Sequence, residues 1–455
     1  MNFEMISTED IALFTSGVRI NLAYIYFKEG MKDVKATFEV IVREDERRNY
    51  FVAAGIRSIA EYVKTVKFNE EHLKFFKEFY KYSDDFIDYL RNYSFKGDIW
   101  AMPEGTIFFP NEPVIRITAR IIDLCLMEQF VINTVMHQTM LASKFARIRI
   151  SAKDKTIASS HVRSHGMESG IKSIRLSKMV GIDSSTMSFY SYKTGDQKTE
   201  GWGATHFFIQ SFESELEAFR VYAKYRPEKS LFMLDTYDFE KGLENFIKVA
   251  KEVESENKQI RAVLLDSGDQ LERSKYVRKK LDENNLGYIK IFAAGNYDEY
   301  KISKMIKENA PIDIFAVATE AVNSTDSPKL EVVFKMVEIE KGDKIFPKIK
   351  LSENKIHYPG KKQVYLIKSS NGNYVSRVIG LEGEMNQESL LIEIIREGSL
   401  VYEFPVLEET ASYFKKQSAK YPSEIFNLTE KINFPIGISK KLQELFDETK
   451  ATYVL

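Results

Sequence analysis

The chain has 455 residues, 44% hydrophobic and 29% charged, a balance typical of globular proteins with large cores. Lys plus Arg (65) and Asp plus Glu (66) nearly cancel, so no overall field favours nucleic acid or an anionic membrane as a partner. The single cysteine, Cys125, excludes internal disulfides and thiolate zinc clusters and fits a reducing cytoplasm. Charges interrupt every apolar run and the N-terminal segment is acidic, so we expect neither a membrane span nor a signal peptide.

Residues 1–149 mix helical and strand patterns and are predicted to form an N-terminal α/β domain. One helical stripe combines Ile56, Ile59, Ala60 and Val63. The expected elements are, in order, a helix over 11–26, a strand over 36–42, a helix over 51–66, helical pieces after the cap residue Asn69 as far as Tyr93, proline-broken strands over 97–119, and a long helix over 121–149.

From residue 150 the pattern moves towards alternating strands and helices. The predicted strand ends recur about every 25 to 31 residues, which is the length of one βα unit. The fold class is therefore predicted to be α/β, with an irregular β/α barrel, an incomplete relative of the TIM barrel, over residues 150–335. Residues 336–455 return to strands, which are predicted to pack back on the N-terminal domain. The expected barrel strands are 231–234, 262–265, 288–292 and 314–319, with helices over 239–254, 271–284 and 298–309 between them.

Polar side chains follow these strands where each strand ends. The apolar run Val263–Leu265 stops at Asp266, and Ser267, Gly268 and Asp269 follow at once. Such side chains meet at the mouth of a parallel sheet or barrel, where carboxylates bind sugar hydroxyls or Mg²⁺. For any single Asp, capping of the next helix is an equally good reading. Two consecutive Asp-x-x-Asp strand ends favour function, and the residues concerned are Asp235, Asp238, Asp266, Asp269 and Asn296.

The histidines give no metal motif. His161 and His165 have the i,i+4 spacing of half a metal site, but Gly166 would interrupt a shared helix and no HExxH pattern is present, so we expect a non-metal role for both. From its local sequence alone, His206 is better explained as a satisfied core histidine. Phosphate-loop, dinucleotide and nucleophile-elbow motifs are absent. The residues by themselves indicate a cytosolic β/α-barrel protein that handles a sugar-phosphate-like ligand.

Several ordered motifs resemble those of one family. They are Gly97-Asp98 with Pro103–Pro113, Ala142–Arg147, Thr205-His206, Ser211–Phe219, Leu234–Asp238, Leu265–Asp269, Asp298–Tyr300, Pro311–Phe315 and Lys355 with Pro359–Lys361. With these motifs the chain, from about Leu13 to Ser439, resembles the nicotinate phosphoribosyltransferases, type II phosphoribosyltransferases that begin the salvage of nicotinate to NAD.

The resemblance implies a homodimer with shared active sites, phosphoribosyl pyrophosphate and ATP as co-substrates, and Mg²⁺. His206 matches the histidine that is transiently phosphorylated during ATP hydrolysis. Asp266 matches the carboxylate that orients the ribose, and Arg163 matches the second arginine of the family's Arg-Arg-x-His-Gly stretch. The expected catalytic residues are therefore His206 and Asp266, and the expected substrate-binding residues are Arg163, Asp235, Ser267, Asp269, Asn296, Thr319 and Ser185.

The sequence departs from the family pattern at several expected site positions. The stacking tyrosine near the N-terminus is replaced by Val18, the first arginine of the Arg-Arg pair by Val162, and the arginine before the Asp-Ser-Gly-Asp stretch by Leu264. Ala316 and Ala318 stand where a phosphate loop has glycines. Three hypotheses follow. The first is a nicotinate phosphoribosyltransferase-like enzyme, with a related enzyme acting on another base as its variant. The second is a non-catalytic homologue that binds a nucleotide or a partner, and the third is a sugar-phosphate barrel enzyme without the family's function.

Overall fold

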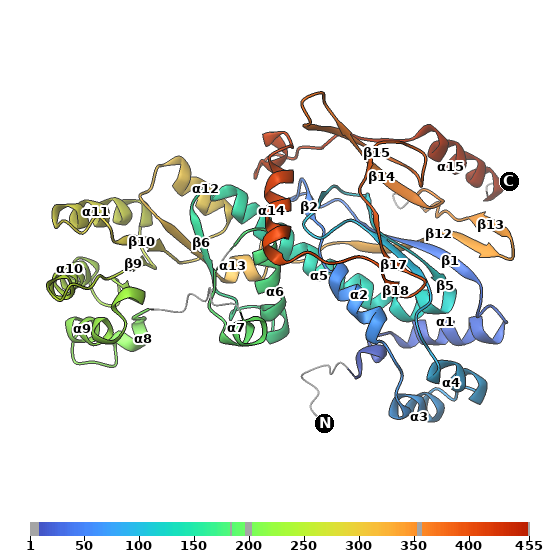
Figure 1. Cartoon of the computed structure of the whole chain (residues 1–455), viewed down its shortest axis with the longest axis horizontal. Helices are drawn as coiled ribbons and strands as arrows, with labels where there is room; N and C mark the ends of the chain where they lie inside the picture. Colours follow the sequence, from blue (N-terminus) through green and yellow to red (C-terminus); the bar gives the residue numbers. More distant parts are fainter. Residues whose placement is uncertain (1–8, 183, 196–202, 353–356, 454–455) are drawn as a thin grey trace. The chain divides into compact units, whose positions relative to one another are not determined.

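The computed structural model describes residues 9–182, 184–195, 203–352 and 357–453 (Figure 1). Two compact units divide the chain, one formed by residues 1–143 with 329–455 and the other by residues 144–328. Helix α5, Ile121–Ser151, carries the chain from the first unit into the second. The first unit is thus assembled from both ends of the chain, and the second from its middle.

The first unit is built on a seven-stranded antiparallel sheet in the order β13-β12-β1-β5-β3-β17-β18. β1 pairs on one side with β5 and on the other with β12, so Val40 lies between Ile115 and Phe334. The predicted joining of C-terminal strands to the N-terminal domain is confirmed. The strands are β1 (Lys35–Val42), β3 (Asp98–Ala101), β5 (Pro113–Arg120), β12 (Val332–Lys341), β13 (Lys344–Pro347), β17 (Ile392–Arg396) and β18 (Ser399–Leu400).

Two smaller sheets and a set of helices complete this unit. The small strands are β2 (Phe51–Val52) with β4 (Ile107–Phe108), and β14 (Lys362–Lys368), β15 (Tyr374–Leu381), β16 (Glu388–Ser389) and β19 (Ile436–Ile438) in the order β16-β14-β15-β19. The helices are α1 (Gly17–Lys28), α2 (Ile56–Thr65), α3 (Glu70–Phe79), α4 (Asp84–Arg91), α14 (Leu407–Ser418) and α15 (Lys440–Tyr453), with short 3₁₀ turns η1 (Ile11–Leu13) and η3 (Ser423–Phe426).

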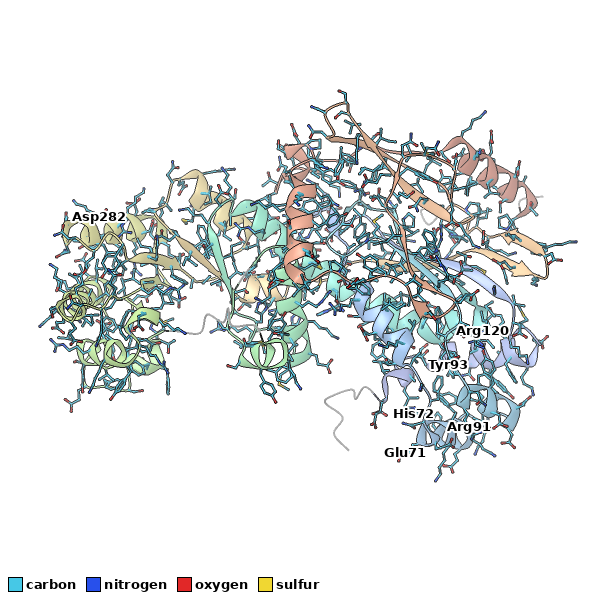
Figure 2. The ribbon with its side chains drawn as sticks, in the orientation of Figure 1. Glu71, His72, Arg91, Tyr93, Arg120 and Asp282 are labelled. Atoms are coloured by element: carbon cyan, nitrogen blue, oxygen red, sulfur yellow. The ribbon has the colours of Figure 1, made fainter. Side chains whose placement is uncertain are left out.

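Local signals in the N-terminal half explain where its helices begin and what they bury. Asn69 caps α3 by accepting a hydrogen bond from the His72 backbone at 2.9 Å, as predicted. At the start of α5, Arg120 pairs with Asp123 at 2.8 Å, and its guanidinium lies over the Tyr93 ring. His72, Tyr93 and Arg120 are labelled in Figure 2. Burial raises the pKa of the Asp123 carboxyl to about 6 against the opposing effect of Arg120.

The second unit contains a six-stranded parallel sheet with the order β7-β6-β11-β10-β9-β8. The last strand, β11, pairs with the first, β6, which is the closure that a barrel requires. Ala204 adds a parallel bridge beside β8, and among the described residues no pairing joins it to β7. The predicted α/β fold class is confirmed, and this strand order fits the predicted incomplete β/α barrel. The strands are β6 (Thr156–Ser159), β7 (Ser184–Ser185), β8 (Leu231–Met233), β9 (Ala262–Leu265), β10 (Lys290–Ala293) and β11 (Ile314–Val317).

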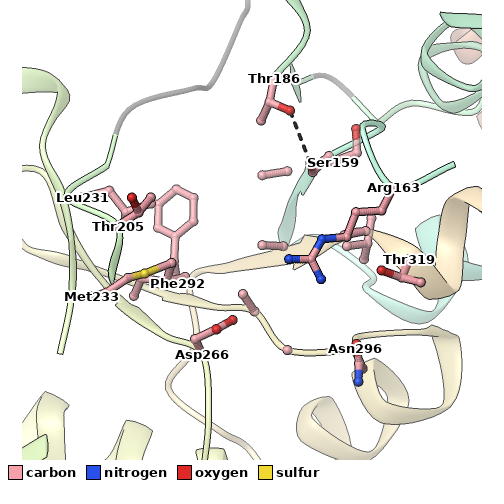
Figure 3. Close-up of a pocket in the computed structure, with 18 of the residues that line it drawn as sticks. Ser159, Arg163, Thr186, Thr205, Leu231, Met233, Asp266, Phe292, Asn296 and Thr319 are labelled. Atoms are coloured by element: carbon pink, nitrogen blue, oxygen red, sulfur yellow. Dashed lines mark hydrogen bonds between the residues drawn. The ribbon is translucent and has the colours of Figure 1, made fainter. Parts of the chain in front are cut away.

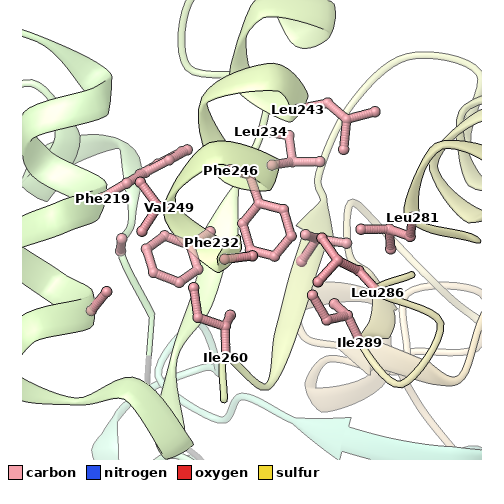
Figure 4. Close-up of a cluster of buried hydrophobic side chains, with 14 of the residues drawn as sticks. Phe219, Phe232, Leu234, Leu243, Phe246, Val249, Ile260, Leu281, Leu286 and Ile289 are labelled. Atoms are coloured by element: carbon pink, nitrogen blue, oxygen red, sulfur yellow. The ribbon is translucent and has the colours of Figure 1, made fainter. Parts of the chain in front are cut away.

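Helices α9, α10 and α11 bury their apolar faces against β8 and β9. Figure 4 shows Phe219 of α9 and Phe246 of α10 meeting Phe232 of β8. A Cβ at Gly242 would lie 2.2 Å from the Leu234 carbonyl, so α10 packs this close only because glycine stands there. The helices of this unit are α6 (Met167–Met179), α7 (Ser188–Thr194), α8 (His206–Ile209), α9 (Glu215–Tyr225), α10 (Phe239–Ser255), α11 (Gln270–Glu283), α12 (Glu299–Lys307) and α13 (Thr319–Val322), with the 3₁₀ turn η2 (Pro227–Lys229).

One local expectation differs from the structure. The helix predicted over 51–66 begins only at Ile56, because residues 51–52 form β2. Near the C-terminal end of α5, Lys144 and Arg147 are both buried and paired with carboxylates. Sequence periodicity reports the face of a helix but not the charges that other elements bring to it.

Candidate active site

The carboxyl ends of the barrel strands surround a cavity of about 710 Å³ (Figure 3). Strand register arranges its wall in rows. Met233, Leu264 and Phe292 are register partners on β8, β9 and β10, and all three line the cavity. Side chains two residues apart on a strand share a face, so Asp266 follows Leu264 on the cavity side. The predicted site residues that line the cavity are Arg163, His206, Asp266, Asn296 and Thr319.

His206 and Asp266 face each other across the mouth of this cavity. His206 is the first residue of α8, and its Nδ1 lies 2.9 Å from the Thr236 hydroxyl. Its Nε2 lies 3.8 Å from Asp266 Oδ2, and the two side chains are 39% and 37% exposed. The expectation from local sequence that His206 is a buried core residue is wrong. One ring nitrogen is held by the protein, and the other faces a carboxylate within reach of a ligand.

Asp235, which follows β8, is held by Ser267 beside the carboxyl end of β9. Its Oδ2 accepts a hydrogen bond from the Ser267 hydroxyl and lies 3.8 Å from Arg273 Nη1. The side chain is only 6% exposed, and among the described residues its Oδ1 has no hydrogen-bond partner. A buried carboxylate oxygen left without a partner is costly, which makes it a natural contact for a ligand hydroxyl or a hydrated cation.

Gly295 determines the path of the loop after β10. Gly295 has φ +90°, and a Cβ there would lie 2.3 Å from the Asp266 carbonyl, so the loop passes directly behind Asp266. Lys301 donates to the Gly295 carbonyl at 2.7 Å and lies 4.3 Å from the centre of the Tyr297 ring. Burial lowers the pKa of Lys301, against the opposing effect of Asp298 and Asp266. Asn296 is thereby held at the cavity edge in a left-handed conformation, with φ +55°.

Arg163 supplies positive charge on the other side of the cavity. Figure 3 shows its guanidinium beside Thr319, across from Met233 and Phe292. Asn323 donates to the Arg163 carbonyl at 2.9 Å and to the Thr319 carbonyl at 3.1 Å, which ties the two segments together. Within the part of the chain that the structure describes, no carboxylate pairs with Arg163. Its charge is available to an anion.

Asp269 and Asp238 do not line this cavity. Asp269 caps α11, and its Oδ1 accepts from the backbones of Leu271 and Glu272 at 3.1 and 3.2 Å. Asp238 caps α10 in the same way, through Lys241 at 2.8 Å. Ser185 lies in β7, but its side chain falls outside the described residues. For Asp238 and Asp269 the capping alternative describes the contacts that the structure shows.

Sequence reasoning missed Thr236 and Arg273, which position the predicted residues. Thr236 follows Asp235 directly and holds His206. Arg273 donates to the Ser267 carbonyl at 2.9 Å and packs 4.4 Å from the centre of the Phe239 ring. Polar residues that immediately follow a strand end are the signal that would have identified Thr236, whereas nothing in the local sequence marks Arg273.

A buried ion cluster holds the start of α12. Glu299 pairs with Lys144 at 2.5 Å and with Arg147 at 2.7 Å, and Lys144 also pairs with Asp326 at 2.8 Å. Lys144 and Glu299 are fully buried. Because α12 follows the Gly295 loop, this cluster fixes one end of the segment that carries Asn296.

Replacing Glu299 by Gln is expected to reduce the free energy of unfolding by about 3 kcal/mol, because Lys144 and Arg147 would lose the carboxylate they share inside the protein. Urea denaturation measures the change. Glu272→Gln removes an exposed partner of Lys275 and is the matched control, with a change below about 0.5 kcal/mol. Equal effects for the two variants would contradict a stabilising role for the buried cluster.

His161 is an internal histidine rather than a metal ligand. It is fully buried, with Nε2 2.8 Å from the Ser159 hydroxyl and Nδ1 2.6 Å from the Ser173 hydroxyl. Burial, with a smaller contribution from Lys178, lowers its pKa to about 3. No group of three His, Cys, Asp or Glu side chains suited to a metal occurs among the described residues.

The depressed pKa of His161 predicts a loss of stability in acid. The unfolded chain takes up a proton near the ordinary pKa of 6.5 and the folded chain only near 3, so stability falls as the pH drops through this window. At pH 5 the expected loss from this group is about 2 kcal/mol relative to pH 8. Urea midpoints measured against pH test this, and His161→Gln should flatten the profile. His357, whose pKa burial lowers to about 4, supplies a similar slope that remains in the variant.

The barrel and its polar mouth define a class of protein: an α/β protein with one cavity that combines an anion-accepting side, carboxylates and an apolar wall. The model of the nicotinate phosphoribosyltransferase N-terminal domain matches residues 13–136. Nicotinate phosphoribosyltransferase pncB2 of Mycobacterium tuberculosis is 33% identical over 95% of this chain and 92% of its own, and nicotinate phosphoribosyltransferase of Bacillus subtilis is 31% identical over 95% and 94%. The chain belongs to the nicotinate phosphoribosyltransferase family.

Solved structures agree in fold. Human nicotinic acid phosphoribosyltransferase superposes with a TM-score of 0.83 at 20% identity, covering 95% of this chain and 99% of its own. The nicotinate-nucleotide pyrophosphorylase of Pyrococcus furiosus gives 0.71 at 22% identity, covering 94% and 100%. In the described part of the chain, no helix is both long and apolar enough to cross a membrane.

Proposed function

We propose that this protein joins nicotinate to phosphoribosyl pyrophosphate, giving nicotinate mononucleotide and pyrophosphate in NAD salvage. The observation that carries the proposal is that Arg163, His206 and Asp266 line one cavity in a chain of this family. The pyridine nitrogen forms a bond to C1 of the ribose while the bond from C1 to the pyrophosphate oxygen breaks. Positive charge develops on the ribose during this step, and a fixed carboxylate stabilises it.

Asp266 and Asp235 are proposed to face the ribose, with Ser267 holding Asp235 in place. Arg163, Asn296, Thr319 and Ser185 are proposed to bind the phosphate groups. These roles are supported, among the described residues, by the unpaired guanidinium of Arg163 and by the buried Oδ1 of Asp235, which has no hydrogen-bond partner. Asp269 is proposed to act by fixing the loop that carries Asp266, since its Oδ1 is engaged at the helix cap.

His206 is proposed to accept the γ-phosphoryl group of ATP, releasing ADP, and to lose it to water as inorganic phosphate. Its position supports this role, because the side chain is accessible and one ring nitrogen is already oriented by Thr236. A phosphoryl group there adds about 1.5 to 2 negative charges close to Asp266, which would reorganise the site before transfer.

The chemistry of the cavity fits Mg²⁺ held mainly by substrate phosphates. Mg²⁺ favours oxygen ligands, usually one or two carboxylates together with phosphates and water. Asp235 and Asp266 supply such oxygens, and when bound the ion would offset charge on the pyrophosphate. We further propose a cytoplasmic homodimer, as the family resemblance implies.

The experiment is a pyrophosphate-release assay with phosphoribosyl pyrophosphate, Mg²⁺ and ATP, with and without nicotinate. Release that depends on nicotinate supports the proposal. Two alternatives give other results: an enzyme for another base would release pyrophosphate only with that base, and a non-catalytic nucleotide-binding homologue would release none. The second alternative is motivated by Leu264 and by the Ala316 and Ala318 pair, whose methyl groups lie at the cavity.

A further inference from the structure

Asp266 and Asn296 line the same cavity from neighbouring strand ends, one after β9 and the other after β10 (Figure 3). Backbone pairing between these strands ends just before them. Ala293 is the register partner of Leu265, and the Ala294 backbone donates to the Leu265 carbonyl at 2.8 Å. Beyond this bond the ladder stops, so backbone pairing by itself does not fix the spacing of Asp266 and Asn296.

The side chain of Gln270 continues the connection between the two strands. Its Nε2 donates to the Leu265 carbonyl at 3.1 Å and also to the Ala294 carbonyl. These carbonyls belong to the planar peptide groups that lead directly into Asp266 and into Gly295, so one amide fixes the orientation of both. Gln270 thereby supplies the bond to Ala294 that a further backbone donor of β9 would make in a longer ladder.

Gln270 is itself held in place. It is the first residue of α11, whose N-terminus Asp269 caps, and it is only 3% exposed. Among the described residues its Oε1 has no hydrogen-bond partner, so the polar contacts of its side chain there are the two donated bonds. Lys301 of α12 binds the next carbonyl, that of Gly295, at 2.7 Å. The consecutive carbonyls of Ala294 and Gly295 are therefore each bound by a side chain.

We propose that Gln270 is a positioning residue for phosphoribosyl transfer, which sets the spacing between Asp266 and Asn296. The proposal rests on the proposed function, in which Asp266 faces the ribose and Asn296 a phosphate group. Both groups belong to one substrate, so both strand ends must be placed correctly at once, and a misplacement of about 1 Å can cost about 10²-fold in rate. Gln270 does not line the cavity and acts through the backbone.

Gln270→Met keeps the length of the side chain but removes both donated bonds. In the pyrophosphate-release assay it is expected to lower kcat/KM for phosphoribosyl pyrophosphate by about tenfold or more. The KM for ATP is expected to stay within about twofold, because His206 and Thr236 come from other segments. Gln259→Met is the matched control with kinetics within about twofold of the wild type, since Gln259 is exposed and precedes β9 at the opposite end of the strand.

Gln270→Glu distinguishes positioning from a general structural defect. At about pH 8 an ionised carboxylate would face two carbonyl oxygens, so kcat/KM is expected to fall at least as far as in Gln270→Met. Protonation restores one O–H donor, so the rate relative to the wild type is expected to rise as the pH falls to about 6, whereas the ratio for Gln270→Met stays flat. The ionisable side chains of the adjoining segments are the same in every variant, and their own titration cancels in the ratio. They are Asp266, Asp269, Arg273 and Lys301.

Wild-type rates per folded molecule in Gln270→Met, with the folded fraction measured by circular dichroism, would overturn the inference. A loss in Gln270→Glu that does not change with pH would overturn it as well. Either result leaves the proposed function standing, because the wild type still releases pyrophosphate. No release by the wild type with any base would instead overturn the proposed function and, with it, the positioning role of Gln270.

Discussion

Replacing Asp266 by Asn is expected to lower kcat/KM for pyrophosphate release by about 10²- to 10³-fold, the size typical of removing one preorganised electrostatic group from an active site. The amide keeps the shape of the side chain but removes the negative charge that faces His206 Nε2 at 3.8 Å and the ribose position. Initial rates at saturating and at limiting phosphoribosyl pyrophosphate would separate kcat from KM. A role in the transition state predicts that kcat falls.

Asp313→Asn is the matched control for this variant. Asp313 is a carboxylate on the same barrel, but it precedes β11 and accepts from the Ile291 backbone at 2.9 Å, at the end of the sheet opposite the cavity mouth. Its activity is expected to stay within about twofold of the wild type, since surface substitutions away from such sites have small effects. Undiminished activity in Asp266→Asn would remove Asp266 from the mechanism.

Replacing His206 by Asn is expected to abolish ATP turnover while leaving the fold intact. The Asn amide can still reach the Thr236 hydroxyl that now contacts Nδ1 at 2.9 Å, but the second ring nitrogen and its nucleophilicity are lost. Release of ADP and acid-labile phosphate on the protein measure the loss, which we expect to exceed about 100-fold on the scale of covalent catalysis. Pyrophosphate release without ATP should persist in the variant.

His165→Gln is the control for the histidine experiment, because His165 is exposed and does not line the cavity. Its ATP turnover should match that of the wild type. Persistence of acid-labile phosphate on the His206 variant would disprove the phosphohistidine at this position, whatever the transferase activity.

Much of the fold follows from patterns that are local in the sequence. The alternation of apolar strands and amphipathic helices after residue 230 predicted β8 to β11 and α10 to α12 to within a few residues, because each βα unit carries its own period and its own caps. The strands of the first unit were harder to predict from the sequence. β13 was missed, since its exposed residues Ile345 and Phe346 in a lysine-rich segment give no buried pattern.

The features of the site also divide into those that the sequence determined and those that only the tertiary structure decided. The sequence alone determined that Asp235, Asp266 and Asn296 follow strand ends, since a strand that stops at a polar residue must deliver it to the sheet edge. Only the tertiary structure decided that His206 turns towards Asp266, that Arg273 steadies Asp235 through Ser267, and that Lys144 reaches Glu299. These contacts join residues far apart in the chain, so their geometry depends on how the strands register and close into a barrel. Leu264 illustrates both contributions. The sequence identified it as an apolar residue near Asp266, and the strand register placed it between Met233 and Phe292 in the lining of the cavity.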